Sequence, residues 1–468
     1  MSISSILNIA KTAMTSTQTL LQVTSNNIAN VNTDGYTRQE AVLSENPSTR
    51  MQNCVLGNGV SVKDIIRHYD KYLEKAIADK NSDLEGQKTL QSYFERIEAL
   101  LEEDNSNLSS NINDFFNGWQ ELSADPTSVS ARTTVVAAGE NLSRGIQNIY
   151  GELRELQSEL DGTIESEVNN VNKILSAIAD LNQQIFNSEG ANADGAADLL
   201  DKRTEMFKKL SGEINVQFVE DKYGRLNVLT GNSGNILVDG NKSWNLRTID
   251  DATTGFKRIA WEDESGNLAD MTDRIEGGKL KALVDMRDEY IGDGFLNDVD
   301  ELAKSIITET NAFHKTGYNL NGTTGISFFS GITEDYAEKI DVNDQIKDDV
   351  GNIAATSSTL NPTDNDIALS IAALVNEKVT INGSQSTFTD YVSAMENNIG
   401  AASKNAKMLS EYQQNTMDTM VSQRESVSGV SIDEEMTNLL KFQRAYQAAA
   451  KLYSVADELF QAILNTVS

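Results

Sequence analysis

Both ends of the chain carry the apolar spacing of a paired helix. In residues 3 to 31, apolar or small side chains recur at alternating spacings of four and three, and residues 439 to 467 repeat the pattern. Such spacings place side chains on one narrow stripe of a helix, as in a coiled coil. The first stripe consists of Ile3, Leu7, Ala10, Met14, Thr17, Leu21, Thr24, Ile28 and Val31, and the second of Leu439, Phe442, Tyr446, Ala449, Tyr453, Ala456, Phe460, Ile463 and Val467.

The two stripes differ in side-chain size. Small residues such as Ala10 and Thr17 occur in the first stripe, whereas the second contains large rings such as Tyr446 and Phe460. Because large side chains of one helix fill small holes in another, we predict that the N- and C-terminal helices pack together. Ser431, three residues before a glutamate, fits a capping box and predicts where the second helix begins.

The back of the first helix has almost no charge. Lys11 is the only charged residue in positions 1 to 33, where average composition would give about eight. A helix of this kind is marginally stable alone and needs neighbours on several sides. We therefore interpret the two stripes as an assembly seam between subunits. A coiled coil within one chain is the alternative, because heptads do not identify the partner helix.

Between the ends, helical periodicity surrounds a region with strand character. Apolar residues from Ile149 to Ile185 recur at a mean spacing of 3.6 and predict a long helix. Residues 65 to 210 have the pattern of an elongated helical bundle. Short β-favouring runs between turn residues at 215 to 238 predict hairpins. We expect a mainly α fold with an inserted β domain, arranged as a nested, multi-domain rod.

The expected domains follow these shifts in pattern. They are an inner coiled-coil assembly domain (1–64 with 430–468), a helical bundle domain (65–212, 278–325 and 363–429), a β-rich outer domain (213–277) and a loop-rich insert (326–362).

Composition argues against several classes of function. The chain has 39 basic and 70 acidic residues, a net charge of -31, which disfavours nucleic acid as a partner. No segment approaches the ~20 consecutive apolar residues of a membrane helix, so we expect no membrane insertion. The N-terminus lacks the basic and apolar regions of a signal peptide. Cys54 is the sole cysteine, which excludes an intrachain disulfide.

Candidate ligand-binding motifs are incomplete. Asp341, Asn343 and Gln345 offer oxygen ligands at alternate positions, but the glycine and the closing glutamate of a calcium loop are missing. Gly57 and Gly59 lack the third glycine of a dinucleotide-binding fingerprint, and a tight turn is the better interpretation. We therefore expect no metal site and no cofactor.

Catalysis is also disfavoured. The only histidines are His68 and His314. A Ser/His/Asp site that combines His314 with Ser305 and Asp298 is an alternative, because such triads are spatial. No Gly-x-Ser-x-Gly nucleophile motif is present, and we expect the protein not to be an enzyme.

Five segments, in order along the chain, resemble the signature segments of flagellar axial proteins. They are SNNIANVNTDGYTRQ (25–39), LGNGVSVKDIIRHYDKYL (56–73), GGKLKALVDMRD (277–288), the helix-to-loop segment 311–329 and the C-terminal block 426–453. The YTRQ ending of the first segment is similar to the hook-associated protein 1 family in particular. The residues that carry this match are Asn27, Ile28, Ala29, Asn30, Asn32, Thr33, Gly35, Tyr36, Arg38 and Gln39.

The resemblance implies a structural subunit at the junction between the flagellar hook and filament, which permits filament assembly. It implies export without a cleavable signal peptide through the flagellar type III apparatus, and an extracellular location on the flagellum. The implied partners are further copies in a helical, ring-like layer, the hook protein, hook-associated protein 3, and a cytoplasmic export chaperone at the C-terminal region. For His314 it implies a structural role. The alternatives are a surface-exposed flagellar adhesin and a paralogous rod- or hook-type axial protein.

Overall fold

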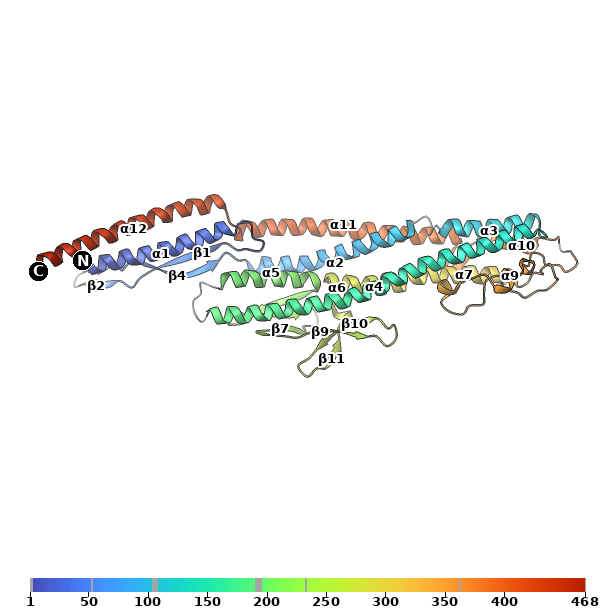
Figure 1. Cartoon of the computed structure of the whole chain (residues 1–468), viewed down its shortest axis with the longest axis horizontal. Helices are drawn as coiled ribbons and strands as arrows, with labels where there is room; N and C mark the ends of the chain where they lie inside the picture. Colours follow the sequence, from blue (N-terminus) through green and yellow to red (C-terminus); the bar gives the residue numbers. More distant parts are fainter. Residues whose placement is uncertain are drawn as a thin grey trace.

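The chain forms a long, narrow molecule in which most helices run along one axis. The computed structural model describes residues 3–51, 54–102, 108–189, 196–231, 234–361 and 363–467. Figure 1 shows both chain ends at one tip of the molecule and the irregular segments at the other. The predicted fold class, mainly α with an inserted β region, is confirmed at this level.

The longest element is helix α4, Val129–Glu189, with 61 residues. At ~1.5 Å per residue it spans about 90 Å. The side chains that predicted a helix from Ile149 to Ile185 are buried, and Leu160 and Ile178 are fully inaccessible. The helix begins well before Ile149 because Ser128 caps its first turn, where its hydroxyl accepts a hydrogen bond from the backbone N–H of Ala131.

The other long helices lie beside α4 or return along it. Helix α11 packs along α2, and α3 and α5 pack against α4. A continuous helical run made of α6, a π-helix and α7 completes the bundle. The bounds are α2 Lys71–Glu102, α3 Leu108–Ala124, α5 Ala197–Glu213, α6 Gly278–Asp285, the π-helix Met286–Leu296, α7 Asn297–His314 and α11 Phe388–Ser428.

The strands predicted at 215 to 238 are present and continue to Asp270. They form one four-stranded antiparallel sheet, in the order β5-β6-β7-β8, and one three-stranded sheet, in the order β11-β10-β9. The strands are β5 Val216–Glu220, β6 Leu226–Thr230, β7 Ile236–Asp239, β8 Lys242–Ser243, β9 Leu246–Asp250, β10 Lys257–Glu262 and β11 Leu268–Asp270.

A buried amide joins these sheets to the bundle. Asn182 of α4 donates to the carbonyl oxygens of Leu226 and Gly240, at 2.8 and 2.7 Å, and accepts from the Leu226 N–H. Its polar atoms therefore satisfy backbone groups of the β region that would otherwise be buried without partners. This arrangement fixes the β region on the side of α4.

The segment predicted as a loop-rich insert is irregular but well packed. Its short elements are α8 Tyr336–Lys339, α9 Asp344–Asp348 and the 3-10 turn Val350–Asn352, followed by α10 Asp366–Ala373 and the hairpin β12 Val379–Ile381 with β13 Ser384–Ser386. Phe328 and Phe329 are fully buried and contact the aromatic rings of α3, including Phe115. Arg132 of α4 donates to the carbonyl oxygens of Pro126 and Ile353. Burial lowers the pKa of its guanidinium to about 10.

The sequence analysis missed a small sheet near the N-terminus. Strand β1, Gln39–Glu45, pairs antiparallel with β4, Val60–Arg67, and the short strands β2, Thr49–Met51, and β3, Cys54–Leu56, also pair. Gly59 precedes β4 with a φ of 81°, and a side chain there would meet Thr12 of the first helix. The glycine therefore lets this hairpin lie close to the N-terminal helix.

His314 is completely buried at the end of α7. Its Nε2 accepts a hydrogen bond from the Ala354 N–H at 2.9 Å, which places the ring proton on Nδ1. That Nδ1–H donates to the carbonyl oxygen of Ile326 at 2.8 Å. Desolvation lowers the pKa of His314 to about 4, and the positive charge of Arg132 acts in the same direction. The ring is a neutral cross-link between two loop segments.

This burial predicts a pH-dependent loss of stability. In the folded protein, the His314 ring stays neutral down to about pH 4. In the unfolded chain, the same ring takes up a proton below about pH 6.5. The free energy of unfolding therefore falls as the pH is lowered through this window. Between about pH 7.5 and 5, His314 reduces it by about 2 kcal/mol. Denaturant unfolding should therefore show that the free energy of unfolding of the wild type, relative to that of His314→Gln, falls by this amount between about pH 7.5 and 5. Both proteins share all other titrating groups, so a constant difference would show that His314 is not buried and neutral.

Candidate assembly surface

The two ends of the chain lie side by side as one pair of helices. Helix α1, Ile3–Ala29, and helix α12, Ile432–Val467, contact each other along much of their length. Figure 1 shows this pair as a separate tip of the molecule, offset from the bundle where α11 ends and α12 begins. Helix α12 begins directly after Ser431, where the capping box predicts its start. We call α1 and α12 the terminal pair.

The predicted seam residues of α1 face the middle of the terminal pair to different degrees. Ala10 and Thr24 are buried, and the side chain of Ile3 lies outside the described residues. The remaining members are partly buried, and they are Leu7, Met14, Thr17, Leu21, Ile28 and Val31. One side of α1 is covered by the same chain, because the Ser16 hydroxyl donates to the carbonyl oxygen of Val60 in β4.

Among the predicted seam residues of α12, the small side chains are more buried than the large ones. Ala449 and Ala456 are buried, whereas Leu439, Phe442 and Tyr446 are partly buried. Tyr453 and Phe460 are each 44% exposed, Ile463 is 51% exposed, and the side chain of Val467 lies outside the described residues. In the single chain the helices therefore approach each other at alanines, and the large rings lie at the edge of the contact.

A second set of apolar side chains on α12 was missed by the sequence analysis. These residues are exposed and do not belong to the predicted stripe. We call them the apolar flank, which consists of Ile432, Met436, Leu440, Leu452, Val455 and Leu459. They form two groups, 432–440 and 452–459. The spacings of three or four within each group were visible in the sequence, but the search followed a single stripe. Clustered apolar side chains on a surface usually mark a contact with another molecule.

Residues of the family motif join the terminal pair to the rest of the molecule. Asn27 is buried and satisfies both ends of its amide. Its oxygen accepts from the Tyr36 hydroxyl at 2.9 Å and the Gln39 N–H at 3.0 Å, and its nitrogen donates to the Gln39 carbonyl at 2.9 Å and to Glu435 at 3.2 Å. Arg38 donates from Nε to the other oxygen of Glu435 at 2.9 Å. The end of α1 is thus tied to the start of α12.

The same loop is tied to the helical bundle. Thr37 donates from its backbone N–H and its hydroxyl to Asp201 of α5, and Arg67 of β4 pairs with that carboxylate at 2.5 Å. Burial raises the pKa of Asp201, although Arg67 and Thr37 oppose the shift. We call Asn27, Thr37, Arg38, Asp201 and Glu435 the polar junction. It connects three parts of the chain that are distant in sequence.

A further contact braces this region from α11. Arg424 donates to Glu74 of α2 at 2.7 Å and to the carbonyl oxygen of Gly35 at 3.0 Å. Gly35 has a φ of 77°, which favours glycine. The other motif residues are more accessible: Ala29, Asn32 and Thr33 are exposed, and Ile28 and Asn30 are partly buried. Burial raises the pKa of the Tyr36 phenol, so this ring acts as a hydrogen-bond donor.

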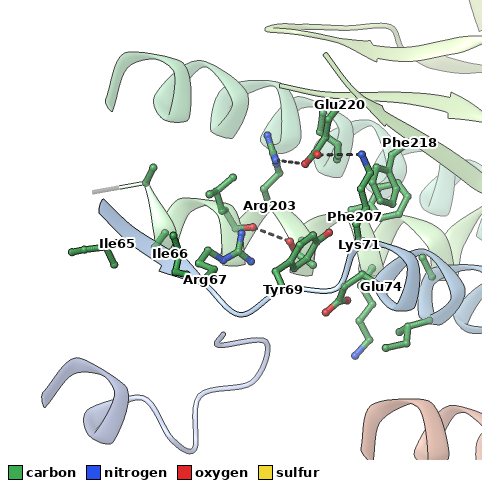
Figure 2. Close-up of a pocket in the computed structure, with 18 of the residues that line it drawn as sticks. Ile65, Ile66, Arg67, Tyr69, Lys71, Glu74, Arg203, Phe207, Phe218 and Glu220 are labelled. Atoms are coloured by element: carbon green, nitrogen blue, oxygen red, sulfur yellow. Dashed lines mark hydrogen bonds and ion pairs between the residues drawn. The ribbon is translucent and has the colours of Figure 1, made fainter. Parts of the chain in front are cut away.

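A cavity of about 570 Å³ adjoins the polar junction between β4, α2 and α5. Figure 2 shows two of its cationic side chains, Lys71 and Arg203, both paired with Glu220. Phe207 and Phe218 supply much of its apolar wall. Burial raises the pKa of Tyr69 to about 12, which keeps its phenol protonated. Through Glu220 of β5, Lys71 of α2 and Arg203 of α5 are linked across this cavity.

The structure does not assemble the considered Ser/His/Asp site. Both ring nitrogens of His314 bind backbone groups. Asp298 instead accepts a hydrogen bond from the Tyr391 hydroxyl at 2.8 Å. His68 lies near the surface, where its Nε2 is 2.8 Å from Glu40. Within the described ranges, no group of three His, Cys, Asp or Glu side chains is placed to hold a metal ion.

Within the same part of the chain, none of the helices combines the length and apolarity needed to cross a membrane.

Comparisons with known proteins agree with the resemblance of segment 25–39 to flagellar axial proteins. The family described as flagellar hook-associated protein FlgK helical domain matches residues 94–329. Flagella basal body rod protein matches residues 7–37, and flagellar basal body rod FlgEFG protein C-terminal matches residues 421–466. The two terminal matches cover most of the terminal pair.

Whole-length relatives carry one name. Flagellar hook-associated protein 1 of Bacillus subtilis is 30% identical over 98% of this chain and 97% of its own length. Its namesake in Salmonella typhimurium is 26% identical over 99% of this chain and 100% of its own length. The structure of the flagellar hook junction protein FlgK from Burkholderia pseudomallei shares the fold, with a TM-score of 0.68 at 15% identity over 76% of this chain and 100% of that chain. The chain therefore belongs to the flagellar hook-associated protein 1 family.

Proposed function

We propose that the chain is a structural subunit of the layer that joins the flagellar hook to the filament, and that it permits filament assembly. The relatives are named for the hook and the hook junction. The observation that carries the proposal is the apolar flank on α12. A helix with Lys11 as its single charged residue, paired with a helix that exposes large apolar side chains, favours contact with further copies of the chain.

The position of the apolar flank supports contacts on two sides. Each residue turns the helix by about 100°, so Ile432, Met436 and Leu440 lie on one side of the predicted seam. Leu452, Val455 and Leu459 lie on the other side, farther along α12. A single helix can therefore contact one copy near the bundle and another near the chain end. The coiled-coil geometry of the terminal pair and its role as an assembly seam belong to this proposal.

The inner assembly domain is then residues 1–64 with 430–468, which includes the terminal pair, β1 and the first five residues of β4. Residues 65–212, 278–325 and 363–429 form the helical bundle domain, 213–277 the outer β domain and 326–362 the insert. The polar junction would hold the inner domain at a fixed angle to the bundle, which a regular layer requires of every copy.

The remaining partners and the export route rest on the family resemblance. They are the hook protein below, hook-associated protein 3 above, and a cytoplasmic chaperone that binds the C-terminal region before export without a cleavable signal peptide. The exposed apolar surface of α12 supports a chaperone contact, because an apolar surface needs protection before assembly. The relatives are structural proteins, and we propose no enzymatic activity.

Cells that lack this protein test the junction role. They should form hooks without filaments, and flagellin should appear in the medium because no layer is present on which the filament can grow. Electron microscopy of the hooks and an assay of secreted flagellin measure both effects. Restoring the wild-type chain should restore filaments. Filaments of normal number on the deletion strain would contradict the proposal.

A charge at the edge of the terminal pair should prevent assembly without unfolding the monomer. Phe460 is 44% exposed in the single chain, so Phe460→Asp should leave the circular dichroism of the monomer unchanged. In the layer the same carboxylate would be buried without a partner, and the fraction of hooks with filaments should fall close to zero. Leu360→Asp is the matched control, because Leu360 is 94% exposed and lies outside the terminal pair. Normal filaments with Phe460→Asp would refute the seam.

The polar junction should stabilise the terminal pair. Asn27→Asp removes the two donated hydrogen bonds and places a second carboxylate beside Glu435. Opening of α1 should become easier by at least about 2 kcal/mol, which amide hydrogen exchange in α1 measures. Asn8→Asp, at an exposed position of the same helix, should have little effect. Equal exchange in the two variants would show that the junction does not hold the helices.

A further inference from the structure

The outer β region contains a groove whose described lining includes no residue of the terminal pair. It has a volume of about 790 Å³ and lies where the two sheets of this region meet. Trp244 and Trp261 both line it, although the chain has only three tryptophans. The third, Trp119, is fully buried in the aromatic core near His314. We call the first site the aromatic groove.

The aromatic groove is held in shape by hydrogen bonds between the sheets. The indole N–H of Trp261, on β10, donates to the carbonyl oxygen of Ile236 on β7 at 2.9 Å. The backbone N–H of Trp244 donates to the carbonyl oxygen of Leu237, also at 2.9 Å. Both rings remain partly accessible. A ligand would therefore meet preformed aromatic surfaces and would not have to order them first.

Polar side chains surround the two rings. Asp239, Asn241 and Lys242 line the groove and together offer hydrogen-bond donors and acceptors. Asn241 also donates to Gln183 at 3.0 Å, and Lys242 lies 3.6 Å from Glu264. Within the described residues, the indole N–H of Trp244 and the carboxylate of Asp239 make no hydrogen bond or ion pair. The groove thus combines flat apolar faces with polar groups that are available to a ligand.

This combination selects a class of ligand. One face of a sugar ring presents C–H groups of slight positive charge, which pack on the negative face of an indole. The hydroxyl groups at the edge of the sugar both donate and accept hydrogen bonds, and so match the mixed groups around the rings. We propose that the aromatic groove binds a neutral oligosaccharide.

Two other ligand classes fit less well. A quaternary ammonium also binds aromatic faces, but it neither donates nor accepts hydrogen bonds. It would leave unused the polar groups of both signs in the lining, which are Arg225, Lys242 and the carboxylates of Asp239, Asp263 and Glu264. Nucleic acid is disfavoured by the net charge of -31. Figure 1 shows strands β7 to β11 standing out from α4, away from the terminal pair at the tip. The groove can therefore stay open when the terminal pair is buried in a layer, and the inference is independent of the proposed function.

Titration of the full chain with maltotriose, cellotriose and triacetylchitotriose tests the inference. Isothermal calorimetry and tryptophan fluorescence should show saturable binding of at least one of these sugars. Trp244→Ala should weaken that binding at least tenfold, and Asp239→Asn should weaken it several-fold. Tyr412→Ala is the matched control, because Tyr412 is an aromatic residue on α11 that is 63% exposed and lies outside the groove. This control should bind like the wild type.

Three results would overturn the inference. One is the absence of saturable binding for all three sugars at millimolar concentration, and another is binding that Trp244→Ala and Asp239→Asn leave unchanged. The third is saturable binding of choline without binding of any sugar, which would assign the groove to a cation. Circular dichroism reports whether the variants are folded, and Asp239→Asn alters an exposed side chain, so its result does not depend on the packing of Trp244.

Discussion

The contact between the first and the last helix is the constraint on which the rest of the molecule depends. Because α1 and α12 lie side by side, the chain between them must run out along the bundle and return. Helices α2 and α11 are the outward and returning paths, and they pack together for the same reason. The β region and the irregular segments are excursions from this long loop. The nested arrangement follows from bringing the two ends together.

The polar junction gives this contact a direction. Helices held only by apolar packing could rotate or slide relative to the bundle, since such contacts are weakly directional. Asn27, Arg38 and Asp201 add hydrogen bonds with defined geometry, which link α1, α12 and α5. This explains why the recognisable motif of the N-terminal segment is rich in polar residues. Its residues position the helices, and in the proposed layer the apolar flank of α12 would supply the surface for association.

Sequence reasoning was most successful where one pattern extended over many residues. The spacing of 3.6 from Ile149 to Ile185 identified α4, because a long helix with one buried face needs an apolar side chain on that face at every turn. The alternation of short runs and turns located the outer strands. The β1–β4 sheet was missed, because its side chains do not alternate between apolar and buried on one face and polar and exposed on the other: Gln39 is buried and Leu43 is exposed. The paired contacts of Asn27 and Glu435 depend on residues far apart in sequence, and no local spacing predicts them.

The proposed assembly surface was predicted only in part. Its location at the two chain ends was predicted from the heptads, but α12 carries apolar side chains around more of its surface than one stripe describes. Several of the rings placed in the seam, such as Phe460, remain half exposed in a single chain. In the proposed layer, neighbouring copies would bury these rings, and a single sequence does not specify how those copies are arranged.

Electron cryomicroscopy of the assembled layer between hook and filament tests the central claim most directly. The account predicts that Leu440 and Leu459 are buried against different neighbouring copies, with the terminal pair on the inside and the β region on the outside. A map in which the apolar flank faces solvent, and the copies contact one another only through the bundle or the β region, would contradict it.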